Sequence, residues 1–474
     1  MNPVSPPRSA LTVAAGLTIT AVCLAVGCTA SGSATAPGAS PWPAQAAGTT
    51  TVTILSGTDT SVSAGNKPVH ADESGMYSQL VDWWNAYEQP RTHIAVALET
   101  IPGGATAEHS EMLSDAETGD ADYDIYNLDN EWVPEFAAAN FIRSLRGGHL
   151  QERDFLPQPF ASGSYGGQLY AAPFTTDVGL LYYRKDLVSK TQVNALRSFS
   201  ALLKLAEQRT TSEGTTPMVG YAGQFADYEG LTVNVLEIIH SYDPNAFTLD
   251  GEIGNENAVI QGLQQLYDAM FVFSVIPPAE RNYTEAQAFT AFATGKALFM
   301  RNWPIDFELL ASASVRGSSQ VASHFAVAPL PFPSVLGGQD LAISAKSRHP
   351  TAALRVIKYL TSPQAEQCLF AVGGFPATRP SAYAQGTALP TGYGGITGHP
   401  LCGTVPGPSP EIGQTILAGI AKAFQRPRTP YYTEFTAIMQ DLVPQLLNGE
   451  PDLNDLVHAL GSGLRAAASG LPPA

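Results

Sequence analysis

The chain has 474 residues, of which 44% are hydrophobic and 14% are charged, a composition typical of globular proteins and enough for about two to four domains. Its 25 basic residues against 42 acidic ones give a formal net charge of -17, which disfavours attraction to phosphate groups, so we expect no nucleic-acid partner. The histidines are scattered and neither a CxxC nor an HExxH spacing occurs, so we predict no metal site and no cofactor.

Residues 1–27 have the pattern of a secretory signal peptide, with one charge, Arg8, followed by an apolar run. The run ends in LAVGC, which resembles the lipobox of bacterial lipoproteins and marks Cys28 as the lipidated first mature residue. Ala25 stands where that motif usually has leucine, so an ordinary signal peptide with a chance cysteine is the alternative. No later stretch approaches the ~18 apolar residues that a spanning helix needs, so we expect the rest to be soluble.

Two further cysteines belong to the mature chain, since Cys23 lies in the removable segment and Cys28 would carry lipid. Thiols outside the cell tend to pair, so we predict a disulfide between Cys368 and Cys402. The alternative is that Cys368, in a helical stretch, is a small buried hydrophobic residue.

Residues 28–50 are rich in Ser, Ala, Gly, Pro and Thr and predict a flexible, lipid-anchored tether. Strand-like and helix-like patterns then alternate in the order βαβαβ, which predicts a parallel sheet. The expected strands and helices, in chain order, are 51–55, 76–88, 94–98, 105–117 and 123–128.

The middle of the chain predicts a second, more helical α/β lobe. After it come two short strands, a helix, and Ser362-Pro363 as an N-cap followed by proline at the first position of another helix. The expected helices are 200–209, 231–241, 257–273, 289–295 and 351–360, and the expected strands are 325–330 and 341–344.

Six segments in register resemble those of a known family. They are YDIYNLDNEWVPEFAAANFI (123–142), YAAPFTTDVGLLYYRKDLV (170–188), DYEGLTVNVLEIIHSYDP (227–244), FATGKALFMRNWP (292–304), VAPLPFPSVLGGQDLAIS (327–344) and PRTPYYTEF (427–435). In this order they resemble the extracellular sugar-binding proteins of ABC importers, in particular their trehalose/maltose-binding branch. The loop at 56–74 does not match the family cleanly, which leaves the sugar and its length open.

The resemblance implies an α/β, two-lobed periplasmic-binding-protein-like fold whose discontinuous lobes are joined by crossing hinge segments. Lobe I would comprise 51–172 and 328–378, and lobe II 173–327 and 379–474. A carbohydrate would bind between the lobes, which close on it by hinge motion. We therefore expect a monomeric receptor, anchored by lipid on the extracellular face of the cell membrane, that delivers a carbohydrate to the permease subunits of an ABC importer.

Three acidic residues of the matching segments are candidate acceptors for sugar hydroxyls. Asp129 follows a strand at the end where open parallel sheets place ligands, although it could instead cap the next helix. The resemblance implies the same role for Asp177 and for Glu229 of the second lobe. Their alternatives are a hinge hydrogen bond to the backbone for Asp177 and a helix-dipole contact for Glu229.

The other candidates supply an aromatic face, close backbone approach and a cation. Trp303 could cover the apolar face of a sugar or pack in the core, and Gly337 and Gly338 could admit ligand or form a tight turn. Arg428 offers a planar fork for two adjacent hydroxyls, with a surface ion pair as its alternative.

A glycoside hydrolase is the strongest rival, because Asp129, Asp177 and Glu229 are carboxylates that could share a cleft. We do not expect an enzyme, since the chain has no GxSxG, no GxxxxGK and no dinucleotide-binding fingerprint. A second rival keeps the fold and changes the ligand to a phosphorylated polyol, a peptide or an amino acid, and a third is a structural or sensory lipoprotein.

Overall fold

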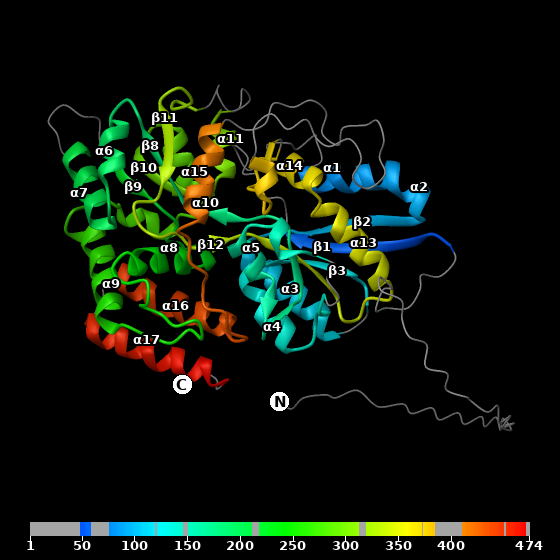
Figure 1. Cartoon of the computed structure of the whole chain (residues 1–474). Helices are drawn as coiled ribbons and strands as arrows, with labels where there is room; N and C mark the ends of the chain where they lie inside the picture. The colour runs from blue at the N-terminus through cyan, green and yellow to red at the C-terminus, as the bar shows by residue number, and fades with distance from the viewer. Residues whose placement is uncertain are drawn as a thin grey trace, which may run out of the picture. The chain divides into compact units, whose positions relative to one another are not determined.

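Two β-sheets organise the part of the chain that the computed structural model describes (Figure 1). All of it belongs to one compact unit. The expected signal peptide, Cys28, nearly all of the tether, most of the loop at 56–74 and Cys402 lie outside the described residues, so the lipid anchor and the disulfide stay predictions. The described residues are 48–57, 75–118, 121–145, 150–210, 218–311, 319–371, 373–383, 410–449 and 452–470.

The first sheet has five strands among the described residues. β1 pairs in parallel with both β2 and β3, which confirms the parallel arrangement expected from the βαβαβ order. β13 pairs antiparallel with β3 and β6, so the complete sheet is mixed. In spatial order the strands are β2 (Ile94–Ile101), β1 (Thr50–Gly57), β3 (Ile125–Asp129), β13 (Gln339–Ile343) and β6 (Ala171–Pro173).

Helices cover both faces of this sheet, which is why residues that face either side of its central strands are largely buried, polar ones included (Figure 1). Val52 and Ile54 belong to the core that α1, α13 and α14 share, whereas Leu55 packs in the core of α3 and α4. The bounds are α1 (Met76–Trp83), α3 (Ala105–Thr118), α4 (Val133–Ala138), α13 (Pro350–Leu360) and α14 (Pro363–Ala371).

The second sheet has four strands among the described residues, with β10 antiparallel to β8 and parallel to β9. Its spatial order is β11 (Phe325–Pro329), β8 (Leu180–Arg184), β10 (Ala297–Asn302) and β9 (Val219–Ala222). The helices of this part are α6 (Lys190–Ala195), α7 (Phe199–Thr210), α8 (Glu229–His240), α9 (Glu256–Phe271), α10 (Glu285–Ala293), α11 (Ile305–Ala311), α15 (Pro410–Ile420), α16 (Tyr432–Leu447) and α17 (Leu453–Ala468).

Two short strands link the sheets. The chain leaves the first sheet after β6 and enters β7 (Asp177–Val178), and it leaves the second sheet after β11 and enters β12 (Leu336–Gly337). β7 and β12 pair antiparallel, with Gly337 opposite Asp177. Both passages therefore run side by side, while the lobe boundaries expected at 173, 328 and 379 stay predictions.

Two helices differ from the sequence expectation for local reasons. The helix expected at 76–88 changes to a π-helix at Trp84–Glu88, and the helical run continues through α2 (Gln89–Thr92) to His93, which is left-handed at φ 56°. The helix expected at 289–295 begins earlier, because Thr284 and Gln287 form a capping box that starts α10 at Glu285.

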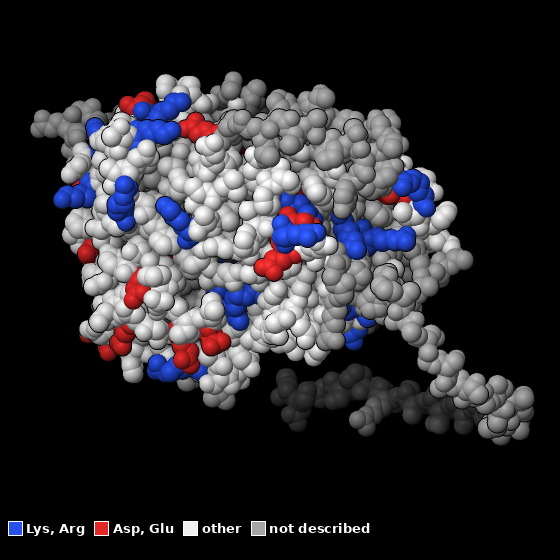
Figure 2. All heavy atoms as spheres, in the orientation of Figure 1, with Lys and Arg blue, Asp and Glu red and all other residues white. Residues whose placement is uncertain are grey.

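Charged side chains of both signs are interspersed on the face drawn in Figure 2, with uncharged surface between them. Among the described helices, none combines the length and the apolar character needed to cross a bilayer.

Candidate functional site

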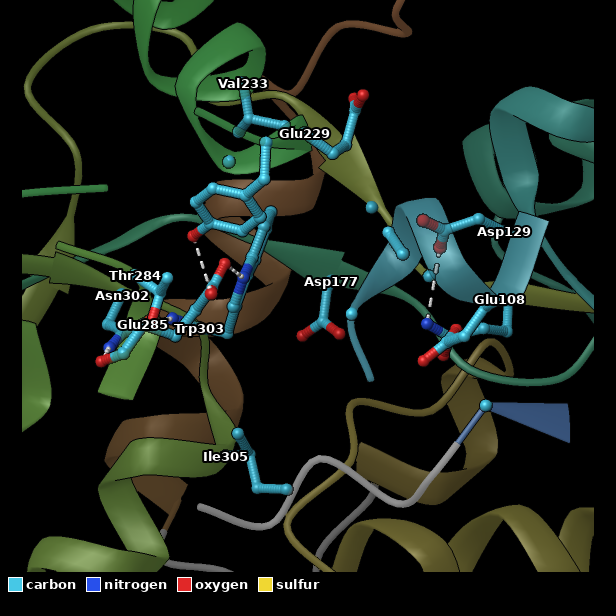
Figure 3. Close-up of a pocket in the computed structure, with 18 of the residues that line it drawn as sticks. Glu108, Asp129, Asp177, Glu229, Val233, Thr284, Glu285, Asn302, Trp303 and Ile305 are labelled. Atoms are coloured by element: carbon cyan, nitrogen blue, oxygen red, sulfur yellow. Dashed lines mark hydrogen bonds between the residues drawn. The ribbon is translucent and has the colours of Figure 1, made fainter. Parts of the chain in front are cut away.

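A cavity of about 420 Å³ lies where elements of both sheets and the β7–β12 link meet (Figure 3). Its described lining includes backbone at Gly337 and Gly338, the indole of Trp303, and side chains from α3, α8, α10 and α11. Carboxylates outnumber cations in this lining. The ionisable side chains among the described lining residues are Glu108, Asp129, Asp177, Glu229, Glu285, Asp306, Tyr77, Tyr228 and Arg426.

Asp129 ends β3 and faces the cavity, as its position after the strand predicted. Gln339 Nε2 donates to Asp129 Oδ1 at 3.3 Å. Burial raises the pKa of Asp129, and the Arg426 guanidinium acts in the opposite direction. The carboxylate makes no capping hydrogen bond to the helical turn that follows, so the capping alternative is not the one that the structure adopts.

Asp177 lies in β7, at the centre of the cavity in Figure 3. Its Oδ1 is buried without a hydrogen-bond partner among the described residues, so the alternative of a hinge hydrogen bond is not seen there. The pKa of Asp177 is raised to about 8, mainly by burial and also by the neighbouring Asp129, while Arg301 acts in the opposite direction. An unpartnered carboxyl in this position is available to a ligand.

Glu229 also lines the cavity, but its carboxylate is fully engaged. Arg426 Nη1 donates to Oε1 at 2.7 Å, the Tyr432 hydroxyl donates to the same oxygen at 2.5 Å, and Thr436 Oγ1 donates to Oε2 at 2.6 Å. In Figure 3 the carboxylate points away from the centre of the cavity. Glu229 therefore positions Arg426 and the start of α16 rather than presenting free acceptors.

The structure does not bring Arg428 to the cavity, and this corrects the sequence expectation. Its Nη2 donates to the backbone carbonyls of Ser162, at 2.8 Å, and Ser164, where the C-terminal end of α5 (Pro157–Ser162) attracts a cation. Arg426 lines the cavity instead.

Arg426 is held between acidic side chains. It forms ion pairs with Glu229 and with Glu131, which lies behind the cavity wall, and its Nη2 donates to Asn130 Oδ1 at 3.3 Å. The Arg426 side chain is 4% exposed, and its positive charge is compensated by these two acids.

Trp303 follows β10 and rests on a second buried ion pair. The Arg301 guanidinium carbon lies 3.9 Å from the centroid of the indole, and Arg301 bonds Glu237 with both Nε, at 3.0 Å, and Nη2, at 2.7 Å. Trp303 Nε1 donates to Glu285 Oε1 at 3.4 Å. These contacts fix the orientation of the indole before any ligand arrives.

The two glycines are required by this arrangement. A Cβ at Gly337 would lie 3.2 Å from Asp177 Cβ and 3.4 Å from the Trp303 ring, so a side chain there would crowd the cavity. Gly338 has φ +121°, and its Cβ would lie 2.3 Å from the Thr175 carbonyl oxygen, which no L side chain tolerates.

A family model for bacterial extracellular solute-binding proteins matches residues 70–367, which is more than half of the chain. The chain belongs to this family. It is 30% identical over 268 residues to a probable ABC transporter-binding protein of Deinococcus radiodurans, a match that covers 52% of this chain and 60% of that relative. It is 24% identical over 315 residues to the multiple sugar-binding protein of Streptococcus mutans serotype c, covering 61% and 69%. The chain thus spans less than two thirds of the length of the Deinococcus relative.

The solved structure of maltose-bound T. maritima MalE3 is 26% identical to this solute-binding protein. The two align with a TM-score of 0.71 over 88% of this chain and 99% of that one. The solute-binding protein therefore has the two-lobed periplasmic-binding-protein fold that the sequence predicted, with each lobe drawn from separate segments. Its relatives are binding proteins of ABC transporters.

Among the acidic and basic residues of the described lining, the sequence reasoning missed four: Glu108, Glu285, Asp306 and Arg426. Burial, with Asp129 adding, raises the pKa of Glu108 to about 8. Glu285 accepts from the Tyr228 hydroxyl at 2.7 Å as well as from the indole. A signal for Arg426 was present, because it stands two residues before Arg428 in the same motif, whereas the three acids lie on separate helices that no spacing connects.

Proposed function

We propose that this solute-binding protein is an extracellular, lipid-anchored receptor that captures a carbohydrate between its lobes and delivers it to the permease of an ABC importer. The ligand is a di- or oligosaccharide of the trehalose/maltose type. Lobe I comprises 51–172 and 328–378, and lobe II comprises 173–327 and 379–474.

The observation that carries this proposal is the pairing of an oriented indole with carboxylate acceptors around one cavity. A sugar presents hydroxyl donors and apolar C–H faces, which suit Asp129, Asp177 and Trp303 respectively. Each hydrogen bond to a charged group contributes about 1.5–3 kcal/mol. A few of them offset the ordering cost and support micromolar affinity, about -8 kcal/mol.

Cavity size and family membership point the same way. The volume of about 420 Å³ lies within the usual range for small-ligand sites, roughly 300–1,000 Å³. The T. maritima structure holds maltose and the Streptococcus relative is named for sugars, so these two relatives favour a sugar as the ligand.

Binding of a sugar panel to the purified mature protein tests the proposal. We expect at least one di- or oligosaccharide to raise the melting temperature, to bind in calorimetry with about micromolar affinity, and to be recovered chemically unchanged. Hydrolysed sugar would support the glycoside hydrolase instead. Binding of no sugar, with binding of an amino acid or peptide, would assign the fold a different solute.

The anchor has its own test. Replacing Cys28 by Ala should abolish incorporation of labelled fatty acid into the exported protein, because the lipid attaches to that thiol. A Cys28→Ala protein that still incorporates the label would contradict the lipid anchor and leave sugar binding unaffected.

A further inference from the structure

The cavity holds more carboxyl groups than a neutral sugar requires. Among the described residues, six carboxylates line it against one guanidinium, and that guanidinium is already paired. The carboxylates are Glu108, Asp129, Asp177, Glu229, Glu285 and Asp306.

Ion pairs with arginine engage only some of these carboxylates. Arg426 neutralises Glu229 and is shared with Glu131, while Arg301 is taken up by Glu237. Within the described part of the chain, Glu285 receives its side-chain hydrogen bonds from two neutral donors, Tyr228 and Trp303.

Two acids provide a second observation besides their number. Asp306 is 1% exposed, and its Oδ2 has no hydrogen-bond partner among the described residues. Asp177 Oδ1 is likewise buried and has no partner among the described residues, and in Figure 3 the side chain stands in the cavity between Glu285 on one side and Asp129 on the other. Buried polar groups are normally satisfied, so unpartnered ones in a cavity indicate a missing donor.

We propose that the ligand of this cavity carries a protonated amine, as an amino sugar does, and that Asp177 receives it. This inference rests on the proposed carbohydrate function and narrows it to an aminated sugar. An ammonium group supplies donors and compensating charge together, and charge-assisted hydrogen bonds in a desolvated site are the strong ones.

The electrostatics agree with this geometry. Burial raises the pKa of both Asp177 and Glu108 to about 8, and Asp129 adds to each shift. A cation among these carboxyls would stabilise their ionised forms and relieve their mutual repulsion.

A metal ion fits the arrangement less well. Within the described ranges, no group of three or more His, Cys, Asp or Glu side chains is placed to hold one. In Figure 3, Asp129 and Glu108 lie on one side of Asp177 and Glu285 on the other, which suits an extended organic ligand.

Matched sugar pairs test the inference on the wild-type protein. Calorimetry near pH 7 compares cellobiose with the disaccharide of two glucosamine units, and trehalose with 2-amino-2-deoxytrehalose. We expect the aminated member of at least one pair to bind about tenfold or more tightly, as one added charge-assisted hydrogen bond supplies. The diacetylated glucosamine disaccharide, which keeps the nitrogens and loses the charge, should lose this advantage.

Measuring affinity at high salt distinguishes an amine bound to a carboxylate in the cavity from general attraction of a cation to an acidic protein. The net charge of -17 attracts any cation weakly, and such attraction is screened at about 0.5 M salt, whereas a buried pair is screened much less. A tenfold preference that persists in salt supports the inference, and one that vanishes overturns it.

Asp177→Asn provides the matched variant, because it removes the carboxyl that an ammonium group would ionise and pair with, and keeps its shape. It should reduce the ratio of aminated to neutral affinity about fivefold or more, whereas Asp441→Asn, an exposed acid of α16 outside the cavity, should leave the ratio unchanged. Neutral sugars that bind as tightly as their aminated partners would overturn this inference alone. Binding of neither kind would overturn the carbohydrate function, and this inference with it.

Discussion

The two walls of the cavity use the same residue types in opposite ways. On the side of the second sheet two acids are paired: Glu229 is bonded by three donors, and Glu237, just behind, is bonded twice by Arg301. Asp306 of α11 is the exception there, since its Oδ2 is buried without a partner among the described residues. On the side of the first sheet, Asp129 receives an amide hydrogen bond from Gln339, and burial raises the pKa of Glu108 to about 8.

This difference shows that the partners of a carboxylate, rather than its presence in a pocket, indicate its role. A paired buried acid belongs to the scaffold, because breaking the pair would leave an uncompensated charge. An unpaired one with a raised pKa is costly to keep in a folded protein, and such groups concentrate at functional sites. The second-sheet wall therefore orients Trp303 and Arg426, and the other wall, with Asp177, offers acceptors to the ligand.

The largest expected effect comes from breaking the scaffold pair. Arg301→Met leaves Glu237 buried without its cation and should lower the free energy of unfolding by about 3–5 kcal/mol. Urea unfolding measures the loss. Lys190→Met is the control, because Lys190 pairs with Glu411 on the exposed surface, and its urea midpoint should match that of the wild type.

A crossed pair of variants tests the comparison directly. Glu229→Gln should lower the free energy of unfolding by about 1–3 kcal/mol, because Arg426 loses one of its two charged partners. Asp129→Asn should change stability little and weaken binding of the best ligand about tenfold. Unfolding and calorimetry on both variants decide. The opposite result, in which Asp129→Asn lowers stability and Glu229→Gln only weakens binding, would contradict the roles given to the two walls.

The architecture was readable from local patterns, because alternating strand and helix periods specify parallel pairing of β1, β2 and β3. The antiparallel pairing of β13 in the same sheet could not be predicted from such patterns. β13 arrives from a distant part of the chain, and no local pattern states that it inserts antiparallel between β3 and β6.

Site residues could be predicted from the sequence where the position of a residue on its own strand or turn determines that it faces the cavity. Asp129 was expected in the cavity because it follows a strand, and Gly337 and Gly338 because they permit close approach. The choice between Arg426 and Arg428 depended on distant partners, the carbonyls at the end of α5 and the acids Glu131 and Glu229. Such long-range pairing leaves no trace in the spacing of a single motif.

The indole gives a smaller effect than the scaffold pair. Trp303→Ala should weaken binding of the best sugar about tenfold, the loss of one stacking contact, with the protein still folded. Trp83→Ala is matched to it, because Trp83 stacks on Tyr87 and does not line the cavity. An unchanged dissociation constant for Trp303→Ala, measured by calorimetry, would remove the indole from the site.

The smallest effect concerns stability without ligand. The folded pKa of Asp177 is about 8, raised by burial above the ordinary value of about 3.9. Its contribution is therefore fully present below about pH 4 and is lost as the pH rises through about 8. Asp177→Asn does not titrate, so its melting temperature should gain on the wild type by a few degrees between about pH 5 and pH 8.

Asp186→Asn supplies a control of opposite sign. The hydrogen bond from Arg184 lowers the pKa of Asp186, so its contribution is present above the ordinary value and is lost only as the pH falls through the folded pKa. The difference in melting temperature between Asp186→Asn and the wild type should stay constant from about pH 5 to pH 8. A constant difference for Asp177→Asn as well would mean that Asp177 is ionised without cost in the empty cavity. Ionised acids on the first-sheet side would then cost the folded protein no more stability than those on the second-sheet side, and the contrast between the two sides would disappear.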